Sequence, residues 1–328
     1  MTRAVRYAGL LAGLVVLNFA LPRALPGDPL DGSAAGGMSS ATATLPAAAQ
    51  AQLRAYYHLD QPILGQFTAY LSDLAHGNLG VSISRGTPVA QLIGERLPWT
   101  ASLVLAAVVI AAVGGSLLGG LLAWKGGRLD RAAVSAAAAV AALPELLIGI
   151  GLALVFAVTL RWFPLQGGQA SFPESGGVNA FALLADRLLH LALPGLTLTL
   201  AGLAAFLLLA RGAVAQVRGA PYIRVARAKG LPETTIAMRH AAPNAALPLL
   251  SYSATRLAQA VGGATLGGAI VVERLYSIPG IGLLAFQSIQ ARDYPVLQAV
   301  FLLASLSILV VNLSADVLCQ ALERRRAA

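Results

Sequence analysis

Long apolar stretches alternate with short polar segments along most of the chain. A helix needs about 20 apolar residues to cross the hydrocarbon core of a membrane. Five stretches exceed this length with at most one acidic or basic side chain each: Trp99–Trp124, Ala132–Leu160, Leu188–Ala210, Ala245–Val272 and Val296–Leu322. The pattern therefore predicts a helical membrane protein.

A sixth apolar stretch, Tyr7–Pro22, is shorter and follows Arg3 and Arg6. A basic start followed by an apolar centre is also typical of a cleaved signal peptide. However, no clean A-x-A cleavage site follows, and the later stretches need a preceding span for a consistent orientation. We therefore expect a retained first helix, and an all-α fold with six transmembrane helices.

Composition and charge support this picture. Of the 328 residues, 57% are hydrophobic and 11% charged, whereas about 25% are charged in an average soluble domain. The net charge of +9 could suggest nucleic acid, but no base-reading module accompanies it. Most Lys and Arg residues fall in segments that are cytoplasmic if the N-terminus is inside. We thus expect both termini in the cytoplasm, the lipid bilayer as a partner, and no nucleic acid.

These patterns divide the chain into four regions: a first transmembrane helix (1–25), an extracytoplasmic segment (26–98), a five-helix core (99–322) and a cytoplasmic tail (323–328). Short surface helices are expected in the outer segment at Ala47–Tyr57 and Pro62–His76, after an irregular stretch, Pro26–Pro46. Pro164–Gly177 is rich in glycine and proline and predicts a second outer loop.

The sequence contains no recognisable catalytic motif. The phosphate-binding pattern G-x-x-x-x-G-K-[ST] is absent, so we expect no ATP hydrolysis by this chain. The four histidines are scattered, the only cysteine is Cys319, and no G-x-S-x-G nucleophile motif occurs. We therefore predict a protein that is not an enzyme and has no metal site or cofactor of its own.

The segment Tyr222–Pro248 is the most informative loop. Tyr222–Lys229 predicts a short basic helix, which Gly230 can end in a left-handed conformation. A second short helix, Thr234–Ala241, is expected to end at Pro243. Two short helices at a fixed turn would form a rigid knob for a partner's groove. An ordinary basic loop held at the membrane face explains the composition equally well.

This loop resembles the EAA loop of ABC importer permeases, in the form found in the oligopeptide, dipeptide and nickel branch. The branch pattern is close to Y-x-R-x-A-R-A-K-G-L, followed by R-H-A-x-x-N-A-x-x-P. The matching residues are Tyr222, Arg224, Ala226, Arg227, Ala228, Lys229, Gly230, Leu231, Arg239, His240, Ala241, Asn244, Ala245 and Pro248. Arg224 replaces the glutamate found in other branches, and Pro243 departs from the pattern.

The resemblance extends over nearly the whole chain, to the first permease type of the branch. The matching elements are Leu25–Pro29, Tyr57–Pro62, Gly77–Ser82, Glu95–Pro98, Glu273, Ile278–Gly282, Arg292–Pro295, Val311–Leu313 and Asp316. It implies a type I ABC importer permease fold in the bacterial inner membrane, with a long extracytoplasmic segment between helices 1 and 2.

The resemblance also implies a function and partners. The chain would form the pore of an ATP-driven importer, most simply for di- or oligopeptides. Its partners would be a second, related permease, two ATPase subunits or one fused ATPase, and an extracytoplasmic solute-binding protein. ATP and magnesium would bind to the ATPases. The ATPase-coupling residues would be Arg224, Ala226, Arg227, Ala228, Lys229, Gly230, Leu231, Arg239, His240 and Asn244.

Charges within the predicted spans could have a separate role. Glu145 could line the pore, or it could pair with Arg256 or with a polar group on a neighbouring helix. Asp316 is expected to cap the helix or to pack locally, and Gly262–Gly268 to form a close helix contact or to flank the pore. Two other functions stay open: import of nickel or another small solute, and a stand-alone secondary transporter. A secondary transporter would need ion-coupling residues within the membrane, and these few charges are a small set for that role.

Overall fold

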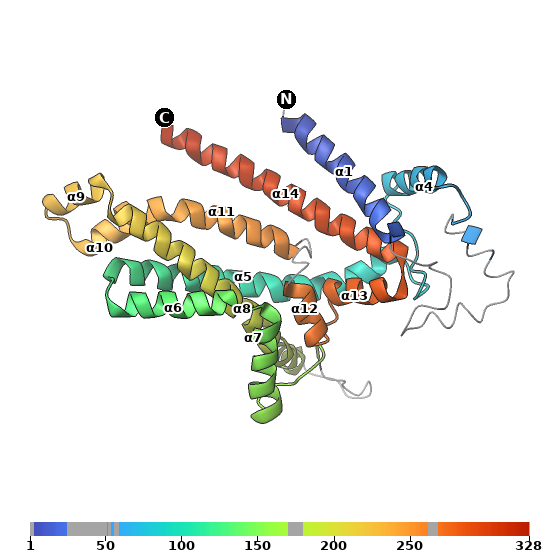
Figure 1. Cartoon of the computed structure of the whole chain (residues 1–328), viewed down its shortest axis with the longest axis horizontal. Coiled ribbons are helices and arrows are strands. Elements are labelled where there is room, and N and C mark those ends of the chain that lie inside the picture. The colour runs from blue at the N-terminus through green and yellow to red at the C-terminus, as the bar shows by residue number, and fades with distance from the viewer. Residues whose placement is uncertain are drawn as a thin grey trace.

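The structure is a computed structural model in which residues 3–24, 51, 54–55, 59–169, 180–261 and 268–327 are described. The elements in these ranges are helical (Figure 1). They are α1 (Arg3–Ala24), α4 (Ile63–Ala75), α5 (Val89–Lys125), α6 (Arg128–Ala142), α7 (Glu145–Leu152), the π-helix η1 (Ala153–Thr159), α8 (Ala180–Arg218), α9 (Pro221–Ala228), α10 (Glu233–Thr235), the π-helix η2 (Ile236–Ala241), α11 (Ala242–Val261), α12 (Gly268–Leu275), α13 (Ile281–Ala291) and α14 (Tyr294–Ala327).

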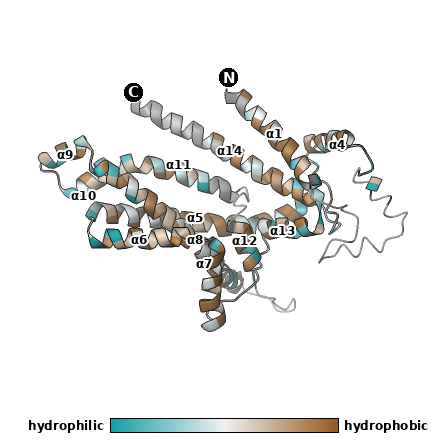
Figure 2. Cartoon of the chain, in the orientation of Figure 1, coloured by the Kyte–Doolittle hydropathy of each residue, from teal (hydrophilic) through white to brown (hydrophobic). Residues whose placement is uncertain are grey.

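Two described helices, α5 and α8, are long and apolar enough to cross a membrane. The bent pair of α6 with α7 and η1 adds a third if it forms one span. Shorter apolar helices occur at Tyr7–Leu21 and Tyr294–Val310. Figure 2 shows apolar residues along α1, α5 and α8, and polar residues on α9 and at the turn between α5 and α6. The all-α membrane architecture is confirmed, while the count of six spans stays a prediction.

The expectation of one continuous helix over Ala132–Leu160 is wrong. The chain bends by 99° between Arg128–Ala142 and Glu145–Thr159. Leu143 is extended, with ψ 132°, and Pro144 has ψ 138°. The ring of a proline disfavours the helical conformation of the residue before it, and proline has no N–H to continue the helix. Local sequence therefore breaks this apolar stretch in two.

The second short helix of the 222–248 loop does not end at Pro243, as the sequence suggested. Instead, η2 continues directly into α11, and Pro243 is the second residue of α11. Pro243 therefore lies inside a continuous helix, where its missing N–H removes one hydrogen bond, and the π-helix η2 directly before it changes the hydrogen-bond register at that point. The loop is thus joined rigidly to the first half of the predicted span Ala245–Val272, whose residues 262–267 lie outside the described residues.

Two glycines bring α5 and α8 into close contact. A Cβ atom at Gly115 would lie 2.7 Å from the Leu203 carbonyl oxygen, and one at Gly119 would overlap the Leu207 backbone. Glycines four residues apart on a helix form a flat surface on which a neighbouring backbone can pack closely. The two longest apolar helices therefore form the centre of the bundle.

A buried carboxylate organises the connection between α12 and α13. Glu273 is 0% exposed, and its Oε1 accepts a hydrogen bond of 2.7 Å from the Thr100 hydroxyl. Its Oε2 accepts one of 3.0 Å from the Leu283 N–H, while Thr100 Oγ1 accepts 2.8 Å from the Ile281 N–H. A Cβ atom at Gly280 would overlap the carboxylate. Glu273 and Thr100 together cap the start of α13.

A second buried carboxylate fixes the loop before α5 to the start of α14. Asp293 is 0% exposed and accepts hydrogen bonds from the hydroxyls of Ser82 (2.5 Å) and Ser84 (2.7 Å). It also accepts from the N–H groups of Ile83 and Ser84, both at 3.1 Å. Part of the predicted extracytoplasmic segment is therefore a fixed part of the fold.

The predicted helix Pro62–His76 is confirmed as α4. Most of Ala47–Tyr57, all of Pro26–Pro46, residues 170–177 of the loop after Pro164, and the side chain of Asp316 lie outside what the structure describes. In Figure 1, α9 and α10 lie at one end of the molecule, and α4 and α13 lie at the other. Both chain ends point away from α4 and α13.

Candidate coupling site

The segment 222–248, here called the coupling loop, contains the turn that its glycine predicts. Gly230 has φ +75°, a conformation that side-chain-bearing residues rarely adopt. Its N–H donates to the Arg227 carbonyl (2.9 Å), and the Leu231 N–H donates to the Ala226 carbonyl (3.3 Å). This pair of bonds is a Schellman motif, which ends α9 at a defined angle. The predicted helix–glycine–helix arrangement is therefore present.

An ion pair closes the turn on its outer side. Arg227 Nε donates to Glu233 Oε1 at 2.6 Å, and Nη2 donates to Oε2 at 3.3 Å. The hydrogen bond from Arg227 holds the pKa of the Glu233 carboxyl below its usual range. The guanidinium also lies 5.7 Å from the ring centroid of Trp124, at the end of α5. Arg227, assigned to ATPase contact by resemblance, thus has a partner within its own loop.

The inner side of the coupling loop is a small apolar core. Ile223 and Ile236 are 0% exposed, and Ala226 and Ala241 pack with them. Trp124 of α5 and Val217 of α8 cover this cluster. The side chain of Ala226 therefore permits close packing inside the loop. These contacts make α9, η2 and the ends of α5 and α8 one packed unit.

The outer side of the coupling loop combines basic and apolar side chains. Arg224, Ala228, Lys229 and Arg239 are exposed. Four apolar side chains are also exposed: Tyr222 by 43%, Val225 by 54%, Leu231 by 37% and Met238 by 72%. His240 is half-buried, and its carbonyl accepts a hydrogen bond of 2.8 Å from Asn244 Nδ2. Asn244 thus joins η2 to α11.

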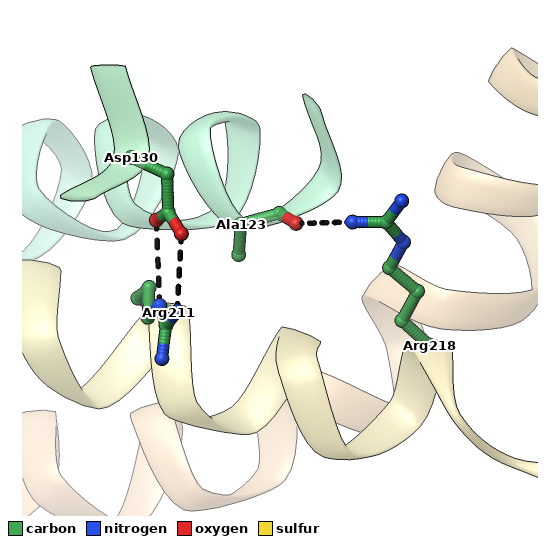
Figure 3. A network of polar contacts seen from close by, with 4 residues as sticks. All are labelled: Ala123, Asp130, Arg211 and Arg218. Carbon is green, nitrogen blue, oxygen red and sulfur yellow. Dashed lines mark hydrogen bonds and ion pairs between the residues drawn. The ribbon is translucent and has the colours of Figure 1, made fainter. Parts of the chain in front are cut away.

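Two arginines of α8 attach the flanks of the loop to the bundle (Figure 3). Arg211 donates from Nε and Nη2 to the two oxygens of Asp130 at 3.3 and 3.0 Å. Arg218 Nη1 donates to the Ala123 carbonyl at 3.1 Å, near the end of α5. Arginine binds a carboxylate through two parallel bonds, which fixes orientation as well as distance. Both contacts hold α8 in position where it enters the coupling loop.

The intramembrane candidates Glu145 and Arg256 line the same small cavity, of about 30 Å³, between α5, α7, α8, α11 and α12. Glu145 Oε2 is buried and has no hydrogen-bond partner among the described residues. A Cβ atom at Gly268 would overlap this carboxylate. The structure thus places both side chains at one cavity in the bundle interior, and their pairing stays a prediction.

Several residues of this site were not singled out from the sequence. Glu233 contacts Arg227 from six positions away, a spacing that no single helix brings together, and only the Gly230 turn makes the contact. Trp124, Asp130 and Arg211 are distant from the loop in sequence. One feature of the sequence could have identified Asp130. It is one of the few acidic residues in the predicted cytoplasmic segments, which are otherwise rich in Lys and Arg.

Comparison with known proteins identifies the class. Residues 115–328 match the family of binding-protein-dependent transport system inner membrane components. A probable peptide ABC transporter permease protein, y4tP of Sinorhizobium fredii, is 33% identical over 96% of this chain and 95% of its own. The glutathione transport system permease protein GsiC of Escherichia coli strain K12 is 33% identical over 97% and 95%.

A solved structure supports the fold. The inward-facing MetNI methionine ABC transporter superposes with a TM-score of 0.52 and 17% sequence identity, over 71% of this chain and 96% of that one. At this identity the likeness establishes the type I permease fold alone. Together with the family match, it means that the chain is a multi-pass membrane protein and a transport subunit, not an enzyme. The chain belongs to the family of binding-protein-dependent transport system inner membrane components.

Proposed function

We propose that this chain forms half of the pore of an ATP-driven peptide importer, and that the coupling loop transmits movement of an ATPase subunit to the helices. The observation that carries this proposal is the rigid turn at Gly230, with its basic and apolar outer side. The energy source lies in another subunit, which binds ATP and magnesium. The cargo is delivered by an extracytoplasmic solute-binding protein.

The outer side of the loop has the chemistry of a docking surface. The exposed side chains of Tyr222, Val225, Leu231 and Met238 lie among Arg224, Lys229 and Arg239. Apolar anchors surrounded by charges suit a groove with an apolar floor and an acidic rim. The charged groups can stay in contact with water at little cost in free energy, whereas burial of the apolar side chains against a partner favours association.

The inner side of the loop supports the transmission of force. Ile223 and Ile236 are 0% exposed and pack with Trp124 and Val217 at the ends of α5 and α8. A closely packed core does not deform gradually, so a displacement of the loop moves the elements attached to it. Because η2 continues into α11, the same displacement reaches a third helix. ATPase closure thereby changes the population of inward- and outward-facing states.

The same geometry supports the proposed orientation and partners. Docking to a cytoplasmic ATPase places α9 on the cytoplasmic side and α4 and α13 outside. Both termini then lie in the cytoplasm, because both point away from α4 and α13 (Figure 1). One loop serves one ATPase, so a second, related permease docks on a second ATPase or on the other half of a fused one.

Peptides are the proposed cargo because similar proteins are named as peptide and glutathione permeases. Glu145, which is buried beside the cavity that Arg256 also lines, is a candidate pore group for a cationic amine. Nickel or another small solute of the same branch is the alternative cargo.

Co-purification and transport test this proposal. A tagged chain expressed with its genomic neighbours should retain an ATPase, and the reconstituted complex should hydrolyse ATP faster when a loaded binding protein is added. Dipeptides, glutathione, longer peptides and nickel are compared as cargo. Retention of no ATPase would contradict the coupling role, whereas stimulation by nickel alone would contradict the peptide assignment and leave the coupling role intact.

A further inference from the structure

A polar cavity of about 210 Å³ lies at the other end of the molecule from the coupling loop. It is formed by the end of α1, one face of α4, residues 78–81 and the first turns of α14. The polar residues in its wall include Arg23, Tyr70, Asp73 and Gln298. None of these residues belongs to the coupling loop or to the cavity beside Glu145.

The wall of this cavity contains two hydrogen-bond donors that the described residues do not satisfy. Tyr70 Oη and Gln298 Nε2 are buried atoms without a hydrogen-bond partner among the described residues. Buried polar atoms are nearly always paired in folded proteins, so two such atoms at one cavity indicate a missing partner. A ligand that enters here must offer polar atoms to both.

The charged side chains at the cavity, Arg23 and Asp73, make no ion pair within the described part of the chain. Arg23 donates to Gln66 Oε1 (2.9 Å) and to the Phe19 carbonyl (3.1 Å), and neither acceptor is a carboxylate. Asp73 accepts a hydrogen bond of 3.1 Å from Asn78 Nδ2, a neutral donor. A half-buried guanidinium and a carboxylate at the same cavity suit a ligand with an anionic and a cationic group.

The surroundings of the cavity are those of a membrane boundary. Arg23 lies in the last turn of α1, directly after the apolar stretch Tyr7–Leu21. Leu10, Leu17 and Leu21 are each more than half exposed, which suits contact with acyl chains. Next to them, α4 packs its Phe67 ring 5.0 Å from that of Phe19. A cation at the end of a membrane helix lies at the level of lipid head groups.

We propose that this cavity binds the head group of a phospholipid that carries both a phosphate and a primary ammonium, with its acyl chains along α1. Arg23, Tyr70 and Gln298 donate to the phosphate oxygens. Asp73 accepts from the ammonium. Phosphatidylethanolamine has this chemistry, phosphatidylglycerol lacks the cation, and the choline group of phosphatidylcholine has no N–H to donate. The lipid thereby joins α1, α4 and α14 at the outer face.

The proposal is tested by measuring which phospholipids the complex retains. The assembled complex is reconstituted into bilayers of phosphatidylglycerol that contain equal minor amounts of phosphatidylethanolamine and phosphatidylcholine, re-extracted in detergent, and analysed for bound phospholipid by mass spectrometry. The wild type should retain phosphatidylethanolamine preferentially. Arg23→Gln should weaken retention of every phospholipid by about tenfold, the effect of losing a charged hydrogen bond. Asp73→Asn should mainly remove the preference for phosphatidylethanolamine.

Matched variants and a soluble ligand separate the alternatives. Arg85→Gln and Asp60→Asn remove like charges that do not line the cavity, and both should retain lipid as the wild type does. Equal retention of phosphatidylethanolamine and phosphatidylcholine by the wild type would overturn the proposal, as would normal selectivity in both Arg23→Gln and Asp73→Asn. Binding of soluble phosphoethanolamine and of a dipeptide is measured in parallel. If either one binds in a way that depends on Arg23 and Asp73, while phosphatidylethanolamine is not retained, the cavity is a solute site instead.

Discussion

Arg227 and Glu233 face each other across Gly230, with Arg227 Nε 2.6 Å from Glu233 Oε1. The pair connects the end of α9 to the start of α10, while Ile223 and Ile236 pack on the opposite side of the same turn. The turn is therefore held from both sides, by charge outside and by apolar packing inside. This arrangement lets a loop at the surface of the bundle act as a rigid part.

Substitutions at Gly230 should act through backbone conformation alone. A Cβ atom there meets no heavy atom within 4 Å, so side-chain volume is not limiting. Asn tolerates a positive φ, Ala is destabilised by roughly 1–2 kcal/mol in this conformation, and Pro cannot adopt it. Transport by proteoliposomes should thus fall in the order Gly230→Asn, Gly230→Ala, Gly230→Pro, with Pro inactive but still inserted in the membrane. Normal uptake by Gly230→Pro would refute the coupling assignment.

The Arg227–Glu233 pair should behave as one unit. Arg227→Gln and Glu233→Gln should each reduce transport at unchanged ATPase content, and the double variant should be no worse than either single variant. The exchanged pair Arg227→Glu with Glu233→Arg should recover part of the activity. Lys125→Gln, which removes an exposed positive charge outside the coupling loop, is the matched control. Strictly additive losses in the double variant would mean that each side chain acts on the ATPase separately.

The pair should also give the loop a pH dependence. Its hydrogen bond holds the pKa of Glu233 below the ordinary value of 4.5, so the ionised form is the one favoured in the folded state. The stabilisation is present above pH 4.5 and is lost as the pH falls through the lower folded value. Trp124, beside Arg227, can report this change. With Trp99 and Trp162 replaced by Phe, its emission should shift with a midpoint below 4.5, and Glu233→Gln should abolish the shift.

Thr100 should be important for stability because its hydroxyl both donates and accepts. It donates to Glu273 and accepts from the Ile281 N–H in a site where all three groups are buried. Thr100→Val leaves both partners unsatisfied and should cost about 1–3 kcal/mol for each buried group. Thr100→Ser keeps the hydroxyl and serves as the control. Thermal unfolding in detergent measures the difference, and equal midpoints for Val and Ser would show that the hydroxyl contributes nothing.

Arg211 should contribute more to coupling than its exposed position suggests. Its two bonds to Asp130 join α8 to the start of α6 beside the coupling loop (Figure 3). Arg211→Lys keeps the charge but cannot make both parallel bonds, so it should restore little of what Arg211→Gln removes. The ratio of transported cargo to ATP hydrolysed measures this effect. Full restoration by Lys would mean that charge alone matters.

The sequence by itself determined the helical membrane class, the short helix α4 and the turn at Gly230. Each depends on residues close together in the chain: an apolar run, a period, or a glycine where a helix must stop. The break at Pro144 and the continuation of the helix through Pro243 were missed, because proline has opposite effects at the two positions. A proline can end a helix or lie inside one, and the outcome depends on the surrounding hydrogen bonds and packing.

Other features were decided only by the tertiary structure. Asp293 accepts from Ser82 and Ser84, more than 200 positions away, and Glu273 requires Gly280 for its close approach. Arg23 and Asp73 line the same cavity because α1, α4 and α14 converge there. No periodicity in a single segment encodes such contacts, because each depends on where the chain brings distant segments together. The sequence thus determined the helical membrane class and the position of the coupling turn, and packing determined which charges share a site.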